Sequence, residues 1–497
     1  MCAQLRVGLA YDEATALHAP ATGSAAGAAE HIERPERVTV VWDALRKARL
    51  DERCERVAPR EVERAEAAAV HSAEHCDALD ALSSAPPQIR GAWAGRGELA
   101  LRSGWLSSGV DMYHNAHTAR AARLAAGCVC ALVERVVSGG LSSGFAVVRP
   151  PGHHACSARM KGFCFLNSVA IAARAAVDRH GLSRVLVVDW DVHHGDGTAA
   201  IFEEDPRVMV ISLHRYGANF YPGTGAVDEV GAGAGVGYSL NVPWRHEGMS
   251  DAEYLCAIDA IVMPVATAFA PELVIVSAGF DAASGDRVGG MALSADGFGA
   301  MAARLRTLAG GRLVLALEGG YKPSLAAKGV AACVRVLLDD PSVRPLSAPA
   351  QPLSAARLAR LARGAQHTLR EVIRCQAAHW PCLKASAAAI QLVPRQCSEG
   401  AEADAAEAGG PGEQSDLGLA RLLRLHASGE AEEQCSDCGE WRPRADFAAN
   451  QLKKRRPGER RCKPCASRGG GASDDAPLPP RRRQGRGGTT RRERHSV

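Results

Sequence analysis

Short apolar runs alternate along the chain with longer Ala-rich segments, from about residue 5 to residue 345. The apolar runs are rich in β-branched residues and predict strands: LRVGLAY, GFAVVRP, RVLVVDWD, RVMVISLH, ELVIVSAGFD and RLVLALEGGY. Segments such as TARAARLAAGCVCALVERVV and NSVAIAARAAVDRHG have the length and composition of helices. Because the strands are continuously apolar and are interleaved with helices, we predict a mostly parallel α/β sheet with helices on both faces.

Changes in the pattern divide the rest of the chain. Residues 351–395 predict further helix, so we assign residues 1–395 to one domain. Residues 396–432 are rich in Ala, Glu and Gly and are typical of a linker. A Cys-bearing segment follows at 433–467, and the Gly-, Pro- and Arg-rich tail at 468–497 is expected to be disordered.

Composition narrows the class of protein. Apolar residues make up 46% and charged residues 23% of the 497 residues, as in ordinary soluble proteins. The start of the chain lacks a signal-peptide pattern, and no run approaches the ~18 apolar residues of a membrane span. We therefore expect a soluble protein with no membrane partner. In such a protein the 16 cysteines favour thiols and metal sites over disulfides.

Charged residues follow the predicted strands, where a buried run would otherwise end. In DWDVHHG the alternation of a strand places Asp189, Asp191 and His193 on one face, and Asp281 ends another strand. Asp191, His193 and Asp281 could hold a zinc ion with an open position, as catalytic zinc sites do. Alternatively, Asp189 and Asp191 could form one structural pair bound to a cation or to backbone amides, and Asp281 could cap a helix.

Two further strand ends carry groups suited to proton transfer and oxyanion binding. His153 and His154 follow Pro-Pro-Gly, and Tyr321 follows the glycines of LEGGY. The two histidines could instead lie in a surface loop, and Tyr321 could be an aromatic residue packed at the rim. Their occurrence together, in this order and each at a strand end, favours one active site.

The combined motifs resemble the zinc-dependent histone deacetylases, particularly the class II branch. The matching stretches are HIERPERV, AVHSAEHCDAL, RPPGHHA, GFCFLN, VDWDVHHGDGT, ISLHRYGANFYPGTG, SAGFDAASGD and LEGGY. The resemblance covers residues 5–395. The resemblance implies the arginase/deacetylase-like α/β fold. It also implies a narrow tunnel that admits an acetyl-lysine side chain, with zinc at its base.

The resemblance assigns the chemistry to particular residues. Asp191, His193 and Asp281 match the zinc ligands. His154 resembles the general base that takes a proton from water and later protonates the departing amine, and His153 resembles its electrostatic partner.

Three further residues complete the implied catalytic set. Tyr321 resembles the residue that hydrogen-bonds the substrate carbonyl and the oxyanion, and Asp189 the residue that orients His153. Asp196 matches the position that orients the second histidine in class I relatives. Class II relatives often have asparagine there, so this position departs from the class II pattern.

The resemblance also implies substrate-binding and potassium-binding residues. Phe163, beside Gly162, and Tyr221 match the aromatic tunnel walls, where Tyr221 replaces the more common phenylalanine. Asp111 aligns with a rim position that hydrogen-bonds the substrate backbone. A structural potassium ion beside the zinc would be held, partly through backbone oxygens, by Asp189, Asp191, His193, Ser212 and Leu213.

These assignments predict a zinc-dependent protein lysine deacetylase, acting on acetylated histones or on other proteins such as tubulin. LEGGY retains the tyrosine that class IIa relatives replace with histidine. Polyamine-selective relatives place a glutamate where this chain has Val288, which disfavours acetylpolyamines. The alternatives are an acetylpolyamine or other small-molecule amidohydrolase and a non-catalytic acetyl-lysine reader or scaffold.

The Cys-bearing segment predicts a second zinc site. Two CxxC pairs, Cys435 with Cys438 and Cys462 with Cys465, resemble LIM-like double-knuckle fingers and would form a four-thiolate structural site. Four unrelated thiols are the alternative.

Basic residues between the CxxC pairs (453–456) and in the tail (481–483) predict contact with nucleic acid or chromatin. A solvated charge run or a nuclear-import signal would show the same composition. The expected location is the nucleus, the cytoplasm or both.

Overall fold

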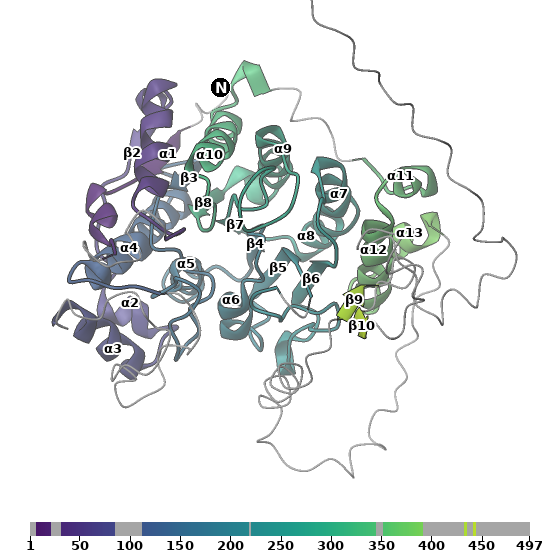
Figure 1. Cartoon of the computed structure of the whole chain (residues 1–497), viewed down its shortest axis with the longest axis horizontal. Helices are drawn as coiled ribbons and strands as arrows, with labels where there is room; N and C mark the ends of the chain where they lie inside the picture. The colour runs from purple at the N-terminus through teal and green to yellow at the C-terminus, as the bar shows by residue number, and fades with distance from the viewer. Residues whose placement is uncertain are drawn as a thin grey trace, which may run out of the picture. The chain divides into compact units, whose positions relative to one another are not determined.

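The sheet of the computed structural model contains all six predicted strands and two more. The structure describes residues 6–20, 31–84, 112–217, 220–343 and 351–390, and the backbone of 432–434 and 441–443. The chain divides into two units, Met1–Gly400 and Ala401–Val497. The first unit contains the α/β fold (Figure 1).

Eight parallel strands form this sheet in the order β2-β1-β3-β8-β7-β4-β5-β6. Their bounds are β1 Val7–Ala10, β2 Glu55–Arg56, β3 Ser143–Ala146, β4 Val185–Asp189, β5 Val208–Arg215, β6 Ser239–Trp244, β7 Leu273–Ala278 and β8 Leu313–Leu317. Strands β4, β7 and β8 are buried along their whole length. A strand covered on both faces must be apolar on both, which explains the continuous apolar runs. The parallel α/β prediction is confirmed.

Helices cover both faces of the sheet (Figure 1). One core cluster packs the sheet against α1, α7–α10 and α12, and the other packs it against α3, α4 and α5. The helices are α1 Glu36–Lys47, α2 Arg64–Ala68, α3 Ala73–Ser84, α4 Thr118–Val137, α5 Ser168–Asp178, α6 Asp196–Ile201, α7 Asp251–Ala257, α8 Met263–Phe269, α9 Ala295–Leu305, α10 Pro323–Leu337, α11 Ala355–Ala359, α12 Arg363–Gln376 and α13 Leu383–Ala389.

The strand register aligns the ends of the central strands. Asp189, the last residue of β4, pairs with Ser212 of β5 on one side and with Ser277 of β7 on the other. The loops that follow β3, β4, β7 and β8 therefore leave the sheet at the same edge. In open parallel sheets this edge is where ligand sites form.

One stretch of the described residues is long and apolar enough to cross a membrane by length and composition. It is Asp251–Phe269, which comprises α7, a π-helical turn and α8, and 67% of its most apolar part is buried inside the protein. That degree of burial is typical of a core helix.

The second unit contains a short antiparallel pair of strands, β9 Glu432–Gln434 and β10 Trp441–Pro443. The predicted linker, finger and tail otherwise lie outside the described residues. The proposed domain boundaries stay a prediction.

Candidate active site

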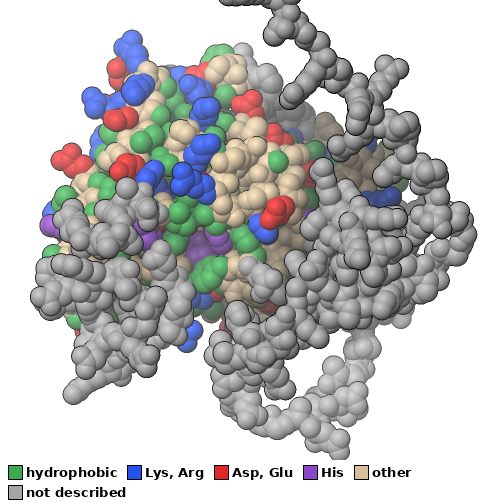
Figure 2. Space-filling view, viewed as in Figure 1, with side chains coloured by type: hydrophobic (Ala, Val, Ile, Leu, Met, Phe, Trp, Pro, Cys, Tyr) green, Lys and Arg blue, Asp and Glu red, His purple; other side chains and the backbone are tan. Residues whose placement is uncertain are grey.

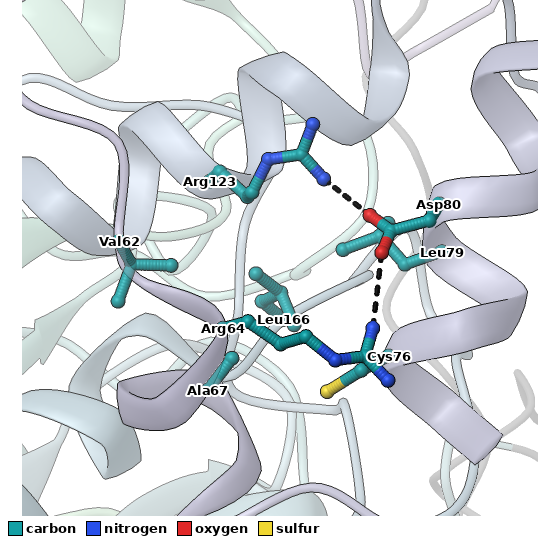
Figure 3. Close-up of a pocket in the computed structure, with 8 residues that line it drawn as sticks. All are labelled: Val62, Arg64, Ala67, Cys76, Leu79, Asp80, Arg123 and Leu166. Atoms are coloured by element: carbon teal, nitrogen blue, oxygen red, sulfur yellow. Dashed lines mark hydrogen bonds and ion pairs between the residues drawn. The ribbon is translucent and has the colours of Figure 1, made fainter. Parts of the chain in front are cut away.

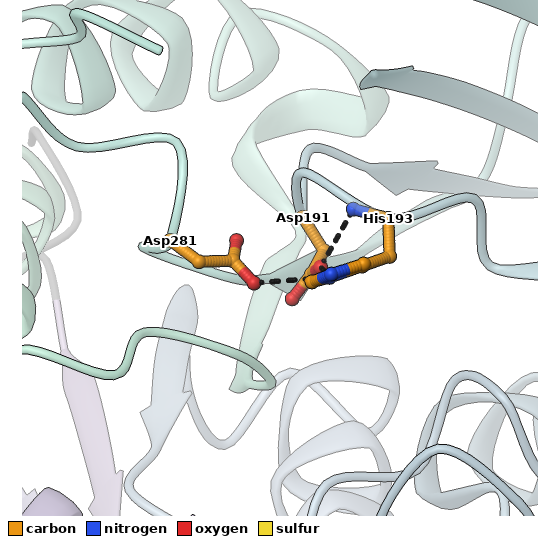
Figure 4. Close-up of side chains that lie close together, drawn as sticks. All are labelled: Asp191, His193 and Asp281. Carbon is orange, nitrogen blue, oxygen red and sulfur yellow. Dashed lines mark hydrogen bonds and ion pairs between the residues drawn. The ribbon is translucent and has the colours of Figure 1, made fainter. Parts of the chain in front are cut away.

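Three potential metal ligands converge at the strand ends. Asp191 and His193 follow β4, Asp281 follows β7, and one ligand atom from each lies within 4.8 Å of the others (Figure 4). His193 Nδ1 is 2.9 Å from Asp191 Oδ1 and 3.2 Å from Asp281 Oδ2. Both carboxylates are fully buried. The structure thus brings together the three residues that the sequence predicts as zinc ligands.

The surroundings of this cluster fit a bound cation. Asp281 Oδ2 is buried and accepts no hydrogen bond from the described residues. Burial and the neighbouring Asp191 charge raise the pKa of Asp281 to about 7. A Cβ atom on Gly319 would lie 2.3 Å from Asp281 Oδ2 and 2.5 Å from Asp191 Oδ2, so only glycine fits beside these oxygens. Two buried carboxylates so close together repel one another when both are charged, so a cation between them would stabilise their ionised forms.

His153 is held by Asp189, the last residue of β4. Its Nδ1 lies 2.9 Å from Asp189 Oδ2, and Asp189 Oδ1 accepts the backbone N–H of Asp191 at 3.0 Å. Burial disfavours a charged imidazole, but Asp189 and Asp191 outweigh it and raise the pKa of His153 well above its ordinary value. The two carboxylates therefore favour the protonated form of His153.

His154 also has an aspartate partner, but its pKa is shifted in the opposite direction. Its Nδ1 lies 2.8 Å from Asp196 Oδ1, at the start of α6. Burial, and then the charge of His153, lower the pKa of His154 to about 3, although Asp196 opposes this shift. Two adjacent histidines with pKa values moved apart are the arrangement expected of an acid–base pair.

Glu318 supports this histidine pair, and the sequence analysis did not identify it. Its buried Oε2 accepts the backbone N–H groups of Gly152 at 2.6 Å and of His153 at 3.2 Å. The loop that carries the histidines is thereby fixed to the end of β8. The sequence feature that could have identified Glu318 is its position in LEGGY, directly after that strand.

Tyr321 lies at the same edge and is almost fully buried. Its ring makes an edge contact with Phe163 at 6.0 Å between centroids, and the Arg37 guanidinium lies 5.2 Å from its centroid. Burial, and then the charges of Asp281 and Asp191, raise the pKa of Tyr321, so its hydroxyl stays protonated. Arg37, which the sequence analysis also missed, donates to the Gly320 carbonyl at 2.8 Å.

Tyr221, the second predicted tunnel wall, packs edge-on against His154 at 4.9 Å and His193 at 6.3 Å. Its hydroxyl is buried and has no hydrogen-bond partner among the described residues. Figure 2 shows histidine side chains within an apolar part of this face of the molecule.

The remaining residues that the sequence predicts for the site are the potassium-binding, rim and finger residues. Ser212 and Leu213 are buried in β5, and Ser212 is paired in register with Asp189. Val288 is partly exposed on the loop after β7. Asp111 and the side chains of Cys435, Cys438, Cys462 and Cys465 lie outside the described residues.

A separate pocket of about 250 Å³ contains none of the predicted site residues (Figure 3). Arg64 and Arg123 both pair with Asp80 there, at 3.0 and 2.6 Å. Arg64 also pairs with Asp77, and Arg123 with Glu61. Because the arginines already have carboxylate partners, this pocket offers no uncompensated charge to a ligand.

Comparison with known proteins identifies a family. A model described as the Histone deacetylase domain matches residues 31–337. Human Histone deacetylase 7 is 42% identical over 393 residues, which is 76% of this chain and 40% of the relative. Histone deacetylase 15 of Arabidopsis thaliana is 41% identical over 358 residues, 72% of this chain and 60% of the relative.

Two further likenesses bear on substrate and fold. Human Polyamine deacetylase HDAC10 is 41% identical over 356 residues, 71% of this chain and 50% of the relative. The chain thus spans 40% to 60% of the length of these curated relatives. The crystal structure of the HDA15 HD domain aligns with a TM-score of 0.67 and 38% identity, covering 78% of this chain and 99% of that one.

Proposed function

Because the chain belongs to the histone deacetylase domain family, we propose that it is a zinc-dependent hydrolase that removes acetyl groups from lysine side chains of proteins. The proposal rests on two groups of side chains that lie next to one another. The cluster of Asp191, His193 and Asp281 lies beside two histidines whose pKa values are shifted in opposite directions.

The surrounding residues define how the amide bond would be hydrolysed. A zinc ion held by Asp191, His193 and Asp281 supplies Lewis-acid polarisation of the acetyl carbonyl when it is bound. His154, neutral at pH 7, accepts a proton as water attacks the carbonyl carbon. Tyr321 donates a hydrogen bond to the carbonyl oxygen as it becomes negative. The C–N bond then breaks, His154 returns the proton to the lysine nitrogen, and acetate leaves.

The neighbouring residues maintain this arrangement. Asp196 orients His154, and protonated His153, held by Asp189, places a positive charge next to it. Phe163 and Tyr221 line the lysine methylenes, with Gly162 beside them, and Asp111 contacts the substrate backbone. Asp189, Asp191, His193, Ser212 and Leu213 would hold a structural potassium ion.

The test is zinc-dependent release of acetate from acetylated histone and tubulin peptides. Replacing Tyr321 by Phe removes one oxyanion donor and should lower kcat by about 10²- to 10³-fold. Tyr238→Phe is the matched control, because that ring packs against Phe269 and Trp380 away from the site. Chelation should abolish activity and zinc should restore it. Turnover that survives both chelation and Tyr321→Phe would contradict the proposal.

An acetylpolyamine substrate is the second candidate, since one relative is named a polyamine deacetylase. Val288 offers no carboxylate to a distal ammonium group, which favours protein substrates. Competition between acetylspermidine and acetylated peptide separates the two. A non-catalytic acetyl-lysine reader would bind the peptide and release no acetate.

We extend the proposal to the C-terminal region. Cys435, Cys438, Cys462 and Cys465 bind a second, structural zinc ion, and the basic segments beside them contact nucleic acid or chromatin. The protein acts in the nucleus, the cytoplasm or both. Loss of affinity for RNA, DNA and nucleosomes on deletion of residues 433–497 is the expected result for the basic segments.

A further inference from the structure

Lys161 shares a carboxylate with His154. Its ammonium group pairs with Asp196 Oδ2, while Asp196 Oδ1 lies 2.8 Å from His154 Nδ1. The side chains of Lys161 and Asp196 are only 14% and 10% exposed. Both oxygens of one nearly buried carboxylate are thus occupied, one by the imidazole and one by the lysine.

The backbone around Lys161 fixes where its side chain begins. The N–H of Lys161 donates to the Cys164 carbonyl at 3.2 Å, and the N–H of Cys164 donates to the Lys161 carbonyl at 2.9 Å. Between them Gly162 and Phe163 both have positive φ, +56° and +67°. Two central residues of positive φ are characteristic of a tight type I′ turn.

This turn lies directly against the imidazole. A Cβ atom on Gly162 would come within 2.4 Å of His154 Cδ2, so the contact permits only glycine. The Cys164 thiol also accepts the backbone N–H of His154 at 3.5 Å. Lys161 therefore extends from a tight turn that packs against His154.

We propose that Lys161 is a positioning residue for His154, acting by holding the Asp196 carboxylate in the plane that orients the imidazole. The inference rests on the proposed deacetylase function, and it adds a residue to which none of the family motifs above assigns a role. An ion pair at the surface contributes little, whereas removal of Lys161 would leave a nearly buried carboxylate with one partner. Asp196 could then rotate, and His154 with it.

Lys161→Met in the full chain tests the proposal. Methionine is unbranched, is only one atom shorter than lysine and keeps the backbone hydrogen bonds of the turn, so Phe163 should stay in place and KM should change little. The misorientation of His154 should lower kcat about 10-fold or more, as loss of an outer-shell partner commonly does. Lys161→Arg should recover most of that loss. Arg159→Met, which removes an exposed cation from the same loop, should leave kcat unchanged.

A double-mutant cycle shows whether Lys161 acts through Asp196. In the Asp196→Asn background, Lys161→Met should change kcat by no more than about twofold, because the carboxylate it holds is gone. The same loss of kcat in both backgrounds would overturn the proposal, and so would a Lys161→Met protein with the kcat of the parent.

Proton NMR provides a readout that does not require turnover. The Nδ1–H of His154, facing Asp196, should give a low-field imidazole signal that is absent in His154→Ala. We expect this signal to persist in Lys161→Arg and Arg159→Met and to broaden or vanish in Lys161→Met. An unchanged signal in Lys161→Met would overturn the inference. An unmodified chain that releases no acetate would contradict the proposed function, and the NMR comparison would still decide the role of Lys161.

Discussion

His153 and His154 are neighbours in sequence, and both are buried, yet their proton affinities are opposite. Burial alone would lower the pKa of both. His153 faces Asp189 directly and lies 3.9 Å from Asp191, so two carboxylates favour its charged form. His154 faces one carboxylate that it shares with Lys161, and it also experiences the charge of His153. At the scale of the residue, the partners of each imidazole decide whether it can accept a proton.

Val288 is the residue on which substrate choice can be tested. Its N–H donates to Asp286 Oδ1 at 3.0 Å, and Asp286 Oδ2 accepts the backbone N–H groups of Tyr321 and Lys322. The position is thus anchored beside the loop that carries Tyr321. A charge introduced there would lie close to the site.

We expect Val288→Glu to shift specificity towards acetylspermidine. The new carboxylate would attract the distal ammonium and raise kcat/KM for acetylspermidine, relative to a neutral acetyl-lysine peptide, by about fivefold, as one exposed charge pair would. Steady-state kinetics on both substrates measure this ratio. Val288→Gln separates charge from size, and an equal gain in that variant would contradict the electrostatic explanation.

At the scale of secondary structure elements, one buried carboxylate joins α1 to the end of β3. Glu33 precedes α1 and accepts hydrogen bonds from Arg149, which follows β3, at 2.7 and 2.8 Å. Arg37 in α1 adds a third contact at 3.1 Å. Burial raises the pKa of Glu33, but the two arginines outweigh it and lower the pKa well below its ordinary value.

Glu33→Gln should lower the free energy of unfolding at pH 7 by about 3–5 kcal/mol, because it leaves buried arginines without their counter-charge. The contribution of a carboxylate with a lowered pKa is complete above its unfolded pKa, near 4.3, and declines as the pH falls below that value. The difference between the two proteins should therefore narrow from pH 7 to pH 3.5. Urea unfolding followed by tryptophan fluorescence measures it.

Glu36→Gln is the matched control, since that side chain is 58% exposed and lies 3.8 Å from Arg34. An exposed pair of this kind should contribute less than about 1 kcal/mol at either pH. A gap between Glu33→Gln and the parent protein that stays constant or widens in acid would contradict the assignment of the charge to Glu33.

The sequence predicts the central strands better than the edges of the sheet. β4, β7 and β8 are flanked by other strands and helices, so their apolar runs are unbroken. β6, SLNVPW, was missed because Asn241 and Pro243 interrupt the apolar pattern. Proline is tolerated there because β6 is an edge strand. β2 has only two residues, too few for any pattern.

The residues of the candidate active site likewise divide into those that the sequence predicts and those that it misses. Asp191, His193 and Asp281 could be predicted because parallel strands bring residues at their ends to one edge. Arg37, Lys161 and Glu318 act through contacts with distant segments, as when Arg37 reaches the Gly320 carbonyl. Such contacts depend on how helices and loops pack. The position of Glu318 directly after a strand marks it as a candidate, but no local pattern in one sequence encodes the partners of these three residues.

The two units of the chain should bind zinc independently. Cys435 and Cys438 fall in residues 435–440, between the antiparallel strands β9 and β10, and Cys462 and Cys465 follow later in the chain. One CxxC pair is a common half of a four-thiolate zinc site. Because none of the proposed catalytic ligands is a cysteine, loss of the finger site should leave the deacetylase site intact.

We therefore expect Cys435→Ser with Cys438→Ser to lower the zinc content of the full chain from about two ions to about one, since a four-thiolate site does not survive the loss of two ligands. Acetate release from a short peptide should be unchanged. Mass spectrometry of the metal after gel filtration gives the zinc content. Cys54→Ser with Cys382→Ser, which removes two free thiols of the first unit, should keep both ions. Unchanged zinc in the finger variant would show that these cysteines are unrelated thiols, and a parallel loss of activity would show that the two sites depend on one another.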